Sequence, residues 1–136
     1  MEKHVIVRKG EISEMLASPS NPGKKMFPPF GGFEGQKSAF RLLEDTTVSN
    51  SPEIHETEGD LWLCLQGEVQ FTCGGTLTEP QEVAPNEISG RAIEGSETMT
   101  LHEGDWLWIP PGVAHMHAAE KTTRLIIIKI PGLTKS

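Results

Sequence analysis

Cysteine is scarce in this sequence, and its two cysteines are too few to form a disulfide framework. Cys64 and Cys73 are the only ones in 136 residues, whereas small disulfide-stabilised folds carry several pairs. Both flank a turn near Gly67, where the expected hairpin would pair Cys64 with a residue near Gln70 and Cys73 with one near Asp60. Because this register does not bring the sulfur atoms together, we expect free thiols, as in a reducing cytoplasm.

Long apolar runs and an excess of basic residues are also lacking. The aliphatic run from Leu125 to Ile128 is the length of a strand, and no N-terminal stretch has the apolar run of a signal peptide or a membrane span. The formal net charge is -7, which opposes a nucleic-acid-binding surface and favours solubility. We therefore expect a cytoplasmic protein whose partners are neither nucleic acids nor membranes.

The N-terminal 37 residues are predicted to lie outside the regular strands of the core. His4 to Arg8 is typical of a strand, and the apolar spacing in Glu11 to Ala17 predicts a short helical turn. Ser18 to Gln36 is rich in proline and glycine, which predicts a long loop. Large apolar residues in this loop either form a lid over a pocket or cover one end of the core: Met26, Phe27, Phe30 and Phe33.

From Ser38 onward, short strands alternate with turns. A hairpin is expected around Gly67, and the polar insertion from Gly74 to Thr98 should hold one or two short strands near Ile88 to Ile93. Many short strands with little helix indicate an all-β sandwich or barrel, in one domain of residues 1–136 whose barrel core covers about 38–130. The expected strands are Ser38–Val48, Leu61–Leu65, Val69–Cys73, Trp106–Ile109, Val113–Ala118 and Arg124–Ile130.

Two acids and a histidine form the first group of chemically interesting residues. Glu53 and His55 are two positions apart, so in a strand both side chains leave the same face. Asp60 is five positions after His55 and has the wrong parity for an unbroken strand. Gly59 could supply a bend or bulge that returns Asp60 to the same face. Such a set would suit a divalent metal ion.

The second group follows a turn at Gly104. Pro110-Pro111-Gly112 predicts a tight reversal into the next strand. In that strand His115 and His117 again share a face by the two-residue rule. If this face points inward, the barrel interior gains two more imidazoles.

The spacing of these two groups resembles the two motifs of the cupin superfamily. His55, four residues, Asp60, six residues and Gly67 resemble the first motif, and Gly104, Pro110, Gly112 and His115 follow the spacing of the second. The resemblance covers residues 53–67 and 104–115, and the strand pattern extends it to about 38–130. It implies a double-stranded β-helix, or jelly-roll barrel, with a short N-terminal helical turn.

The resemblance also implies a metal site, and three positions depart from the family pattern, one of them Ala119, where the second motif often ends in asparagine. Glu53 stands where the family has its first histidine, and Asp60 stands where it has a glutamate. His55 and His115 are therefore expected as metal ligands, joined by Asp60 and Glu53. Two imidazoles with carboxylates suit iron(II), manganese, nickel or zinc. Asp60, shorter than glutamate by one methylene, could instead reach the ion through water or be an ordinary edge acid.

The fold alone does not select a reaction. One hypothesis is a small metal-dependent enzyme of dioxygenase, isomerase or lyase type, acting on a small organic molecule, with Glu53 or His117 moving protons. The alternative is a non-catalytic cupin that binds a small molecule. His117 could also support His115 from behind or line the substrate cavity.

The orientation of the remaining strand residues follows from parity. If Asp60 faces inward, so do Trp62 and Cys64. The alternating residues Leu61, Leu63 and Leu65 then face outward, where they either pack within the monomer or form a dimer face. The resemblance implies a homodimer. Trp106 and Trp108 are expected in the barrel wall or core, and His102 on the surface.

Overall fold

The computed structural model describes residues 4, 6–27 and 40–133, and it is built almost wholly of antiparallel strands. Its helix is α1 (Lys9–Ala17). The strands are β1 (Gly23–Phe27), β2 (Phe40–Ser49), β3 (Glu53–His55), β4 (Glu58–Gln66), β5 (Val69–Cys73), β6 (Thr76–Leu77), β7 (Gln81–Ala84), β8 (Glu87–Ser89), β9 (Ile93–Glu94), β10 (Glu97–Leu101), β11 (Trp106–Ile109) and β12 (His115–Pro131).

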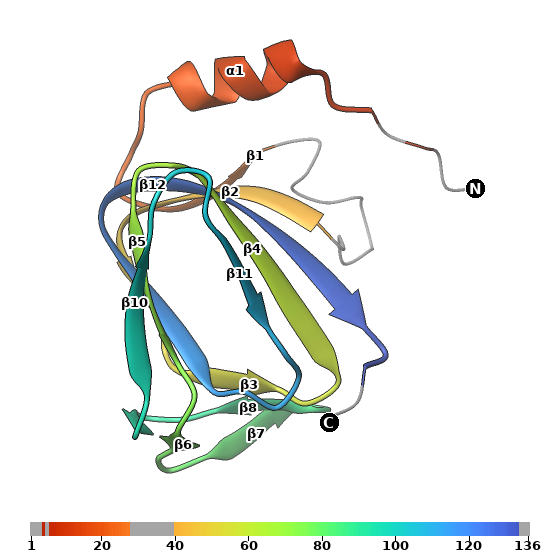
Figure 1. Ribbon diagram of the computed structural model, residues 1–136, viewed down its shortest axis with the longest axis vertical. Helices are drawn as coiled ribbons and strands as arrows, with labels where there is room; N and C mark the ends of the chain where they lie inside the picture. The colour runs from red at the N-terminus through yellow and green to blue at the C-terminus, as the bar shows by residue number, and fades with distance from the viewer. Residues whose placement is uncertain (1–3, 5, 28–39, 134–136) are drawn as a thin grey trace.

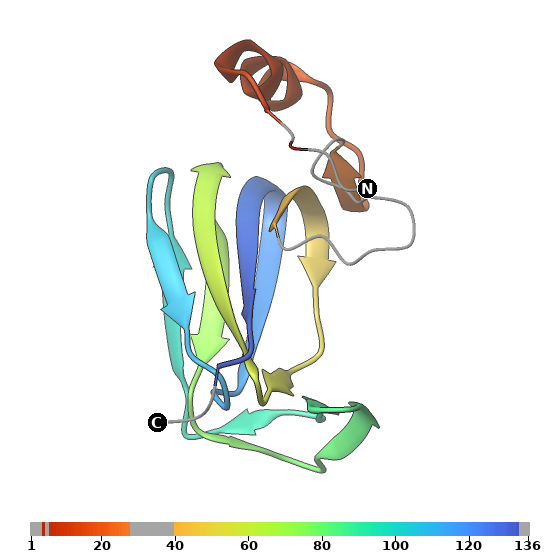
Figure 2. The ribbon, with the colours of Figure 1, turned by 90° about the vertical axis from the view of Figure 1, so that its right-hand side faces the viewer.

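Ten of the strands form two layers that share β12, and β6 pairs with β9 in a separate two-stranded sheet (Figure 1). In one layer, β1, β2, the C-terminal part of β12, β4 and β11 are neighbours. In the other, β7, β8, β3, the N-terminal part of β12, β5 and β10 are neighbours. Helix α1 lies across one end of the barrel, whereas β3, β7 and β8 lie at the opposite end (Figure 2). The all-β barrel expected from the strand pattern is therefore confirmed.

Strand β12 joins the layers because it bends rather than ends. Separate strands were expected at Val113–Ala118 and Arg124–Ile130, but His115–Pro131 is a single strand. Its register with β2 shifts between Ala119 and Thr122. A bulge of this kind increases local twist and bends a strand, so β12 can pair with β5 at its start and with β4 at its end.

The predicted hairpin around Gly67 is wrong in its pairing. Among the described strands, β4 and β5 each pair with β12 and not with one another. Gly67, with φ of 80°, turns the chain from one layer to the other, and a Cβ there would lie 2.3 Å from the Thr122 carbonyl oxygen. Cys64 lies opposite Leu125 and Cys73 opposite His115, and both thiols are free, as expected.

The core fills the space between the layers and follows the two-residue period. Trp62 and Cys64 are buried and point inward, as predicted, together with Phe71. Trp106 and Trp108 belong to the barrel wall but not to the core, since they are 57% and 43% exposed. They point outward because each lies opposite an outward-facing leucine of β4.

The N-terminal segment differs from the prediction in two places. The helix is confirmed and begins slightly earlier, where the Glu11 carboxylate accepts a hydrogen bond from the Arg8 amide. The strand predicted at His4–Arg8 is wrong, because His4 and residues 6–8 are in no strand. The predicted loop from Ser18 to Gln36 contains β1, which is stabilised by pairing with the edge of β2.

The sequence leaves two roles open for the apolar residues of that loop, either a lid over a pocket or a cover over one end of the core. Phe27 is 5% exposed and packs with Leu42, so this residue covers the core. Met26, in contrast, is 43% exposed. Phe30 and Phe33 lie outside the described residues.

The insertion from Gly74 to Thr98 is more ordered than predicted. It contains β6, β7, β8 and β9 and the beginning of β10, so strands occur near Ile88 to Ile93 but also beyond them. Its most important pairing is that of β8 with β3, which places Glu87 opposite His55. No helix in the described ranges is long and apolar enough to cross a membrane.

Candidate metal centre

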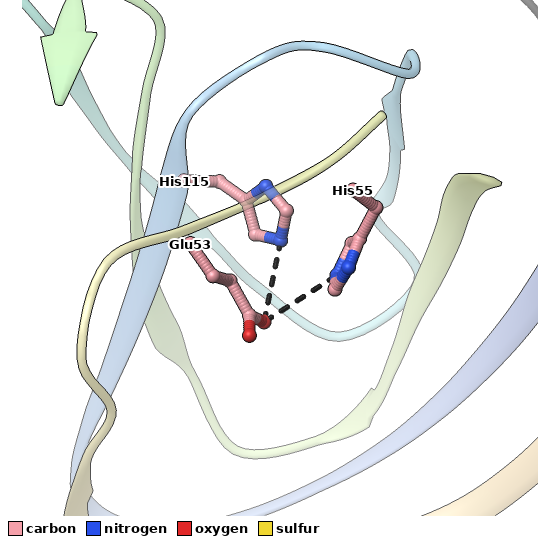
Figure 3. A group of neighbouring side chains, drawn as sticks. All are labelled: Glu53, His55 and His115. Carbon is pink, nitrogen blue, oxygen red and sulfur yellow. Dashed lines mark ion pairs between the residues drawn. The ribbon is translucent and has the colours of Figure 1, made fainter. Parts of the chain in front are cut away.

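Strand β3 brings Glu53 and His55 to the same face, as their spacing predicts. Its Glu53 pairs with His115 of β12, so a third side chain joins them. Glu53 Oε1 lies 3.5 Å from Nε2 of His55 and 3.5 Å from Nε2 of His115 (Figure 3). The two imidazole rings have centroids 5.0 Å apart, and both residues are buried.

Asp60 approaches the same point from β4. Its Oδ2 atom lies 3.4 Å from His55 Nε2 and 3.5 Å from His115 Nε2, and Asp60 is 1% exposed. The chain bends at Glu56 and Thr57, between β3 and β4, and this bend corrects the parity. Gly59, expected to supply the bend, lies within β4, and the Trp108 ring covers it so closely that a Cβ there would lie 2.1 Å from a ring carbon.

The Pro110-Pro111-Gly112 turn holds the start of β12 against β3. Gly112 has φ of 84°, a conformation that glycine adopts without strain. Its amide donates a 2.8 Å hydrogen bond to the His55 carbonyl oxygen. The turn thereby fixes the distance between the segments that carry His55 and His115.

Both histidines direct Nε2 into the cluster because Nδ1 is already engaged. Nδ1 of His115 lies 3.0 Å from the Val113 carbonyl oxygen, and Nδ1 of His55 lies 2.6 Å from Oε2 of Glu87. A carbonyl oxygen can only accept, and a carboxylate accepts when ionised, so the proton of each neutral imidazole resides on Nδ1. Nε2 then presents its lone pair, which is the arrangement of metal-ligating histidines held by a carboxylate or carbonyl.

Glu53, His55 and His115 form a group of metal-ligand type, with one ligand atom of each within 4.8 Å of the others. Asp60 is not part of that group but lies beside both imidazoles, and all four residues are hereafter the four-residue cluster. His115 Nε2 and Asp60 Oδ2 are buried and make no well-formed hydrogen bond, only ion-pair contacts at 3.4–3.5 Å, so a shared ligand would improve their pairing. The nitrogen–oxygen separations of 3.4–3.5 Å match the spacing of about 3.4 Å between ligands of a four-coordinate ion with bonds of about 2.1 Å. The donor set suits iron(II), manganese, nickel or zinc.

Charges within the cluster shift every group toward its ionised form. Burial lowers the pKa of both histidines, but the Asp60 and Glu53 carboxylates outweigh burial and raise the pKa to about 10 for His55 and about 9 for His115. Burial raises the pKa of both acids, yet the two imidazoles hold them well below their usual range. An ion entering the cluster would therefore replace protons on the imidazoles.

His117 lies apart from the four-residue cluster and, within the described residues, belongs to no group of metal-ligand type. Its Nε2 lies 2.8 Å from Oδ2 of Asp45, a fully buried acid of β2. Its ring packs against Trp62 and Phe71, with centroids 5.2 Å from each. Lys24 reaches Asp45 from the surface at 3.1 Å. The histidine thus ends a polar chain that runs from the surface into the barrel.

Three residues of this region were not predicted. Lys129 donates a 2.8 Å hydrogen bond to Asp60 Oδ1, and its inward parity with Leu125 and Ile127 is a signal that could have revealed it. Glu87 reaches His55 only because β8 pairs with β3, and the sequence carries no sign of that pairing. Asp45 likewise depends on the register of β2 with β12.

No protein-family model matches this chain, and no curated protein matches it in sequence. Among solved structures, the Drosophila melanogaster CENP-C cupin domain is similar, with a TM-score of 0.51 and 15% identity over 72% of this chain and 65% of that chain. Drosophila CENP-C bound to CAL1 has a TM-score of 0.52 and 15% identity over 71% of this chain and 64% of that chain. Recombinant oxalate oxidase in complex with glycolate has a TM-score of 0.50 and 14% identity over 71% of this chain and 43% of that chain.

These likenesses establish the fold. The chain is a cupin jelly roll, as the two spaced motifs predicted, and it spans less than two thirds of the length of each of these three chains. Identities this low carry no activity from one protein to the other. Any function must therefore be argued from the residues of this chain.

Proposed function

We propose that this protein is a small metal-dependent enzyme that acts on a small organic molecule at the four-residue cluster. The observation that supports the proposal is the convergence of two correctly oriented imidazoles with two carboxylates, in which His115 Nε2 and Asp60 Oδ2 are buried with only long ion-pair contacts. Buried polar atoms of this kind are rarely left without a closer partner. A divalent ion held by these residues satisfies all of them.

An ion at this site would supply Lewis-acid polarisation of a carbonyl or hydroxyl oxygen, or oxygen chemistry if it is iron. The chain's own groups would then bind the substrate and move its protons. The side chain of Glu53 is 41% exposed, so it forms the solvent side of the cluster, and where it does not bind the ion it would exchange protons with an entering molecule. His117 Nδ1 is buried without a hydrogen-bond partner, so it can accept a hydrogen bond from a substrate hydroxyl deeper in the barrel.

Metal content is the first test of the proposal. Purified protein loaded in turn with iron(II), manganese, nickel and zinc is measured by elemental analysis together with His55→Ala and His115→Ala. His102→Ala is the matched control, because the side chain of His102 is 66% exposed and lies outside the cluster. We expect about one ion per chain in the wild type and the control, and loss of the ion in both cluster variants. Metal retention in those variants would exclude this site.

Turnover distinguishes the enzyme from a non-catalytic cupin that binds a small molecule. The metal-loaded protein is incubated with small organic acids, phenols and sugars while NMR follows the substrates and an electrode follows oxygen. Conversion that disappears in His115→Ala supports the enzyme. Binding of a panel compound with no conversion under any metal supports the binding protein instead.

A further inference from the structure

Lys129 places its ammonium group inside the proposed metal centre. It lies in β12 directly opposite Asp60 of β4, and its side chain is 14% exposed. Its Nζ atom lies 2.8 Å from Asp60 Oδ1 and 3.4 Å from His55 Nε2. The ammonium is thus beside two of the residues that would hold an ion.

An ammonium at this point opposes a divalent cation. His55 Nε2 is the atom that faces the four-residue cluster, and a dication bound to it would lie within a few ångströms of Lys129 Nζ. Repulsion between like charges at such distances is strong in a partly buried site, where water screens poorly. The divalent ion and the Lys129 ammonium therefore weaken one another's binding in these positions.

The structure also provides a position to which Lys129 can withdraw. Glu58 Oε1 lies 3.5 Å from Nζ, and its side chain is 29% exposed. A rotation of the long lysine side chain toward Glu58 would keep the ammonium paired while moving it away from His55. Without an ion, the same ammonium partly compensates buried Asp60, which is otherwise a costly buried charge.

We infer that Lys129 is an internal cation that competes with the divalent ion for the four-residue cluster, so that it weakens metal affinity and makes the ion exchangeable. This inference rests on the proposed metal centre. It assigns Lys129 a role in metal affinity that neither of the two sequence motifs contains. The competition is electrostatic, so it should disappear with the charge and persist when the charge is kept.

Metal titration of charge variants tests the inference. Dissociation constants for zinc and manganese are measured by calorimetry at one fixed pH for the wild type, Lys129→Met, Lys129→Gln and Lys129→Arg. Lys121→Met is the matched control, because Lys121 lies in the same strand at an exposed position. We expect the dissociation constant to fall by about tenfold or more in Lys129→Met and Lys129→Gln, and to stay near the wild-type value in the other two.

Folding is followed in the same samples, because removal of Lys129 leaves Asp60 without its partner. Circular dichroism shows whether each variant is folded, and the rise in Tm on adding zinc reports the same competition through linkage. That rise should be larger in both uncharged variants than in the wild type. Lys129→Gln can still donate a hydrogen bond to Asp60 and serves if Lys129→Met does not fold.

The outcomes separate this inference from the proposed function. Unchanged or weaker metal binding in the folded uncharged variants, with normal binding in the wild type, overturns the role of Lys129 and leaves the metal centre standing. Binding only in the uncharged variants supports competition by Lys129 and refutes a metal-dependent function for the natural chain. No binding by any variant refutes both.

Discussion

At the scale of single residues, the site depends on groups that orient its ligands. His55 is held by Glu87 and His115 by the Val113 carbonyl oxygen. These partners touch Nδ1, so they select the ring nitrogen that faces the cluster. A side chain that never contacts the ion can therefore control its affinity.

Glu87→Gln is the substitution that isolates this effect. The amide removes the charge that fixes the His55 tautomer, and loss of such a partner typically costs about 10–100-fold in metal affinity. We expect that loss in a zinc titration by calorimetry. Glu82→Gln is the control, since Glu82 is an exposed acid in the neighbouring strand β7. An equal loss in both variants would mean that overall charge, and not the contact with His55, determines the affinity.

The buried pair of Asp45 and His117 makes a separate prediction about pH. Burial raises the pKa of Asp45, but the hydrogen bond to His117 and the charge of Lys24 outweigh burial and lower it below the ordinary value of 3.8. The folded state therefore binds this proton more weakly than the unfolded state does. The resulting stability is present above the ordinary pKa and is lost as the pH falls through the lower folded value.

Asp45→Asn tests this prediction because it removes the titrating group. Urea unfolding at pH 7 should show the variant to be less stable than the wild type by about 1–3 kcal/mol. That difference should shrink as the pH falls below the ordinary value of 3.8, since the wild type loses the contribution of Asp45 there. A difference that stays constant down to pH 3 would show that the carboxylate pKa is not lowered by folding.

At the scale of elements, Arg124 fastens α1 to the barrel. Its guanidinium donates to Glu44 Oε1 at 2.7 and 2.9 Å and to the Leu16 carbonyl oxygen at 2.6 Å. Arg124 is 3% exposed and Glu44 is fully buried. None of the helix residues is buried, so side-chain packing alone holds the helix weakly. Arg124 therefore holds the helix in place together with two other contacts. Met15 packs against the cluster of Phe27 and Leu42, and Gln66 also donates to the Leu16 carbonyl oxygen.

Arg124→Met should strongly destabilise the protein. It leaves Glu44 as an uncompensated buried charge, and breaking a buried pair in this way costs about 3–5 kcal/mol. Urea unfolding measures the loss, and hydrogen exchange should quicken in α1. The double variant Arg124→Met/Glu44→Leu should recover part of the stability because no unpaired charge remains. Arg91→Met, at an exposed arginine, should change stability by less than about 0.5 kcal/mol.

The elements also show what sequence could and could not predict. Period-two alternation located most strands and the inward faces of Glu53, His55 and His115, because parity is a local property. Pairing partners are not local: β4 and β5 were expected to pair together, and each pairs with β12 instead. Glu87 was missed for the same reason, since its contact with His55 exists only through the pairing of β3 with β8.

At the scale of the whole molecule, one outer face of the barrel is apolar. Two rows of side chains cross its strands, one through Trp106, Leu63 and Ile126 and one through Trp108 and Leu61. Leu65 packs within the monomer against the cluster of Phe27 and Leu42, as does Ile126. The other side chains of these rows are exposed or half-buried. Trp106 and Trp108 are the exposed side chains of these rows, at 57% and 43%, and exposed apolar groups that lie together often mark an interface.

We propose that a second copy of the chain covers this face in a homodimer. A two-fold dimer uses the same patch on both copies, and tryptophan, present here as Trp106 and Trp108, is enriched at the centres of interfaces. Light scattering after gel filtration should give twice the chain mass of 14.9 kDa. Trp106→Lys/Trp108→Lys should give a folded monomer, because burying two ammonium groups at an interface is costly.

The control for the dimer is another exposed apolar residue. Val83 is 65% exposed in β7, at the end of the barrel beside β3 and β8, so Val83→Lys should leave the dimer intact. A wild-type protein that stays monomeric at all concentrations would refute the pairing. Because the four residues of the proposed metal centre all belong to one chain, the monomeric tryptophan variant should keep its metal content. If that variant lost the bound metal together with the dimer, the second copy would be needed to hold β3 and β12 in place.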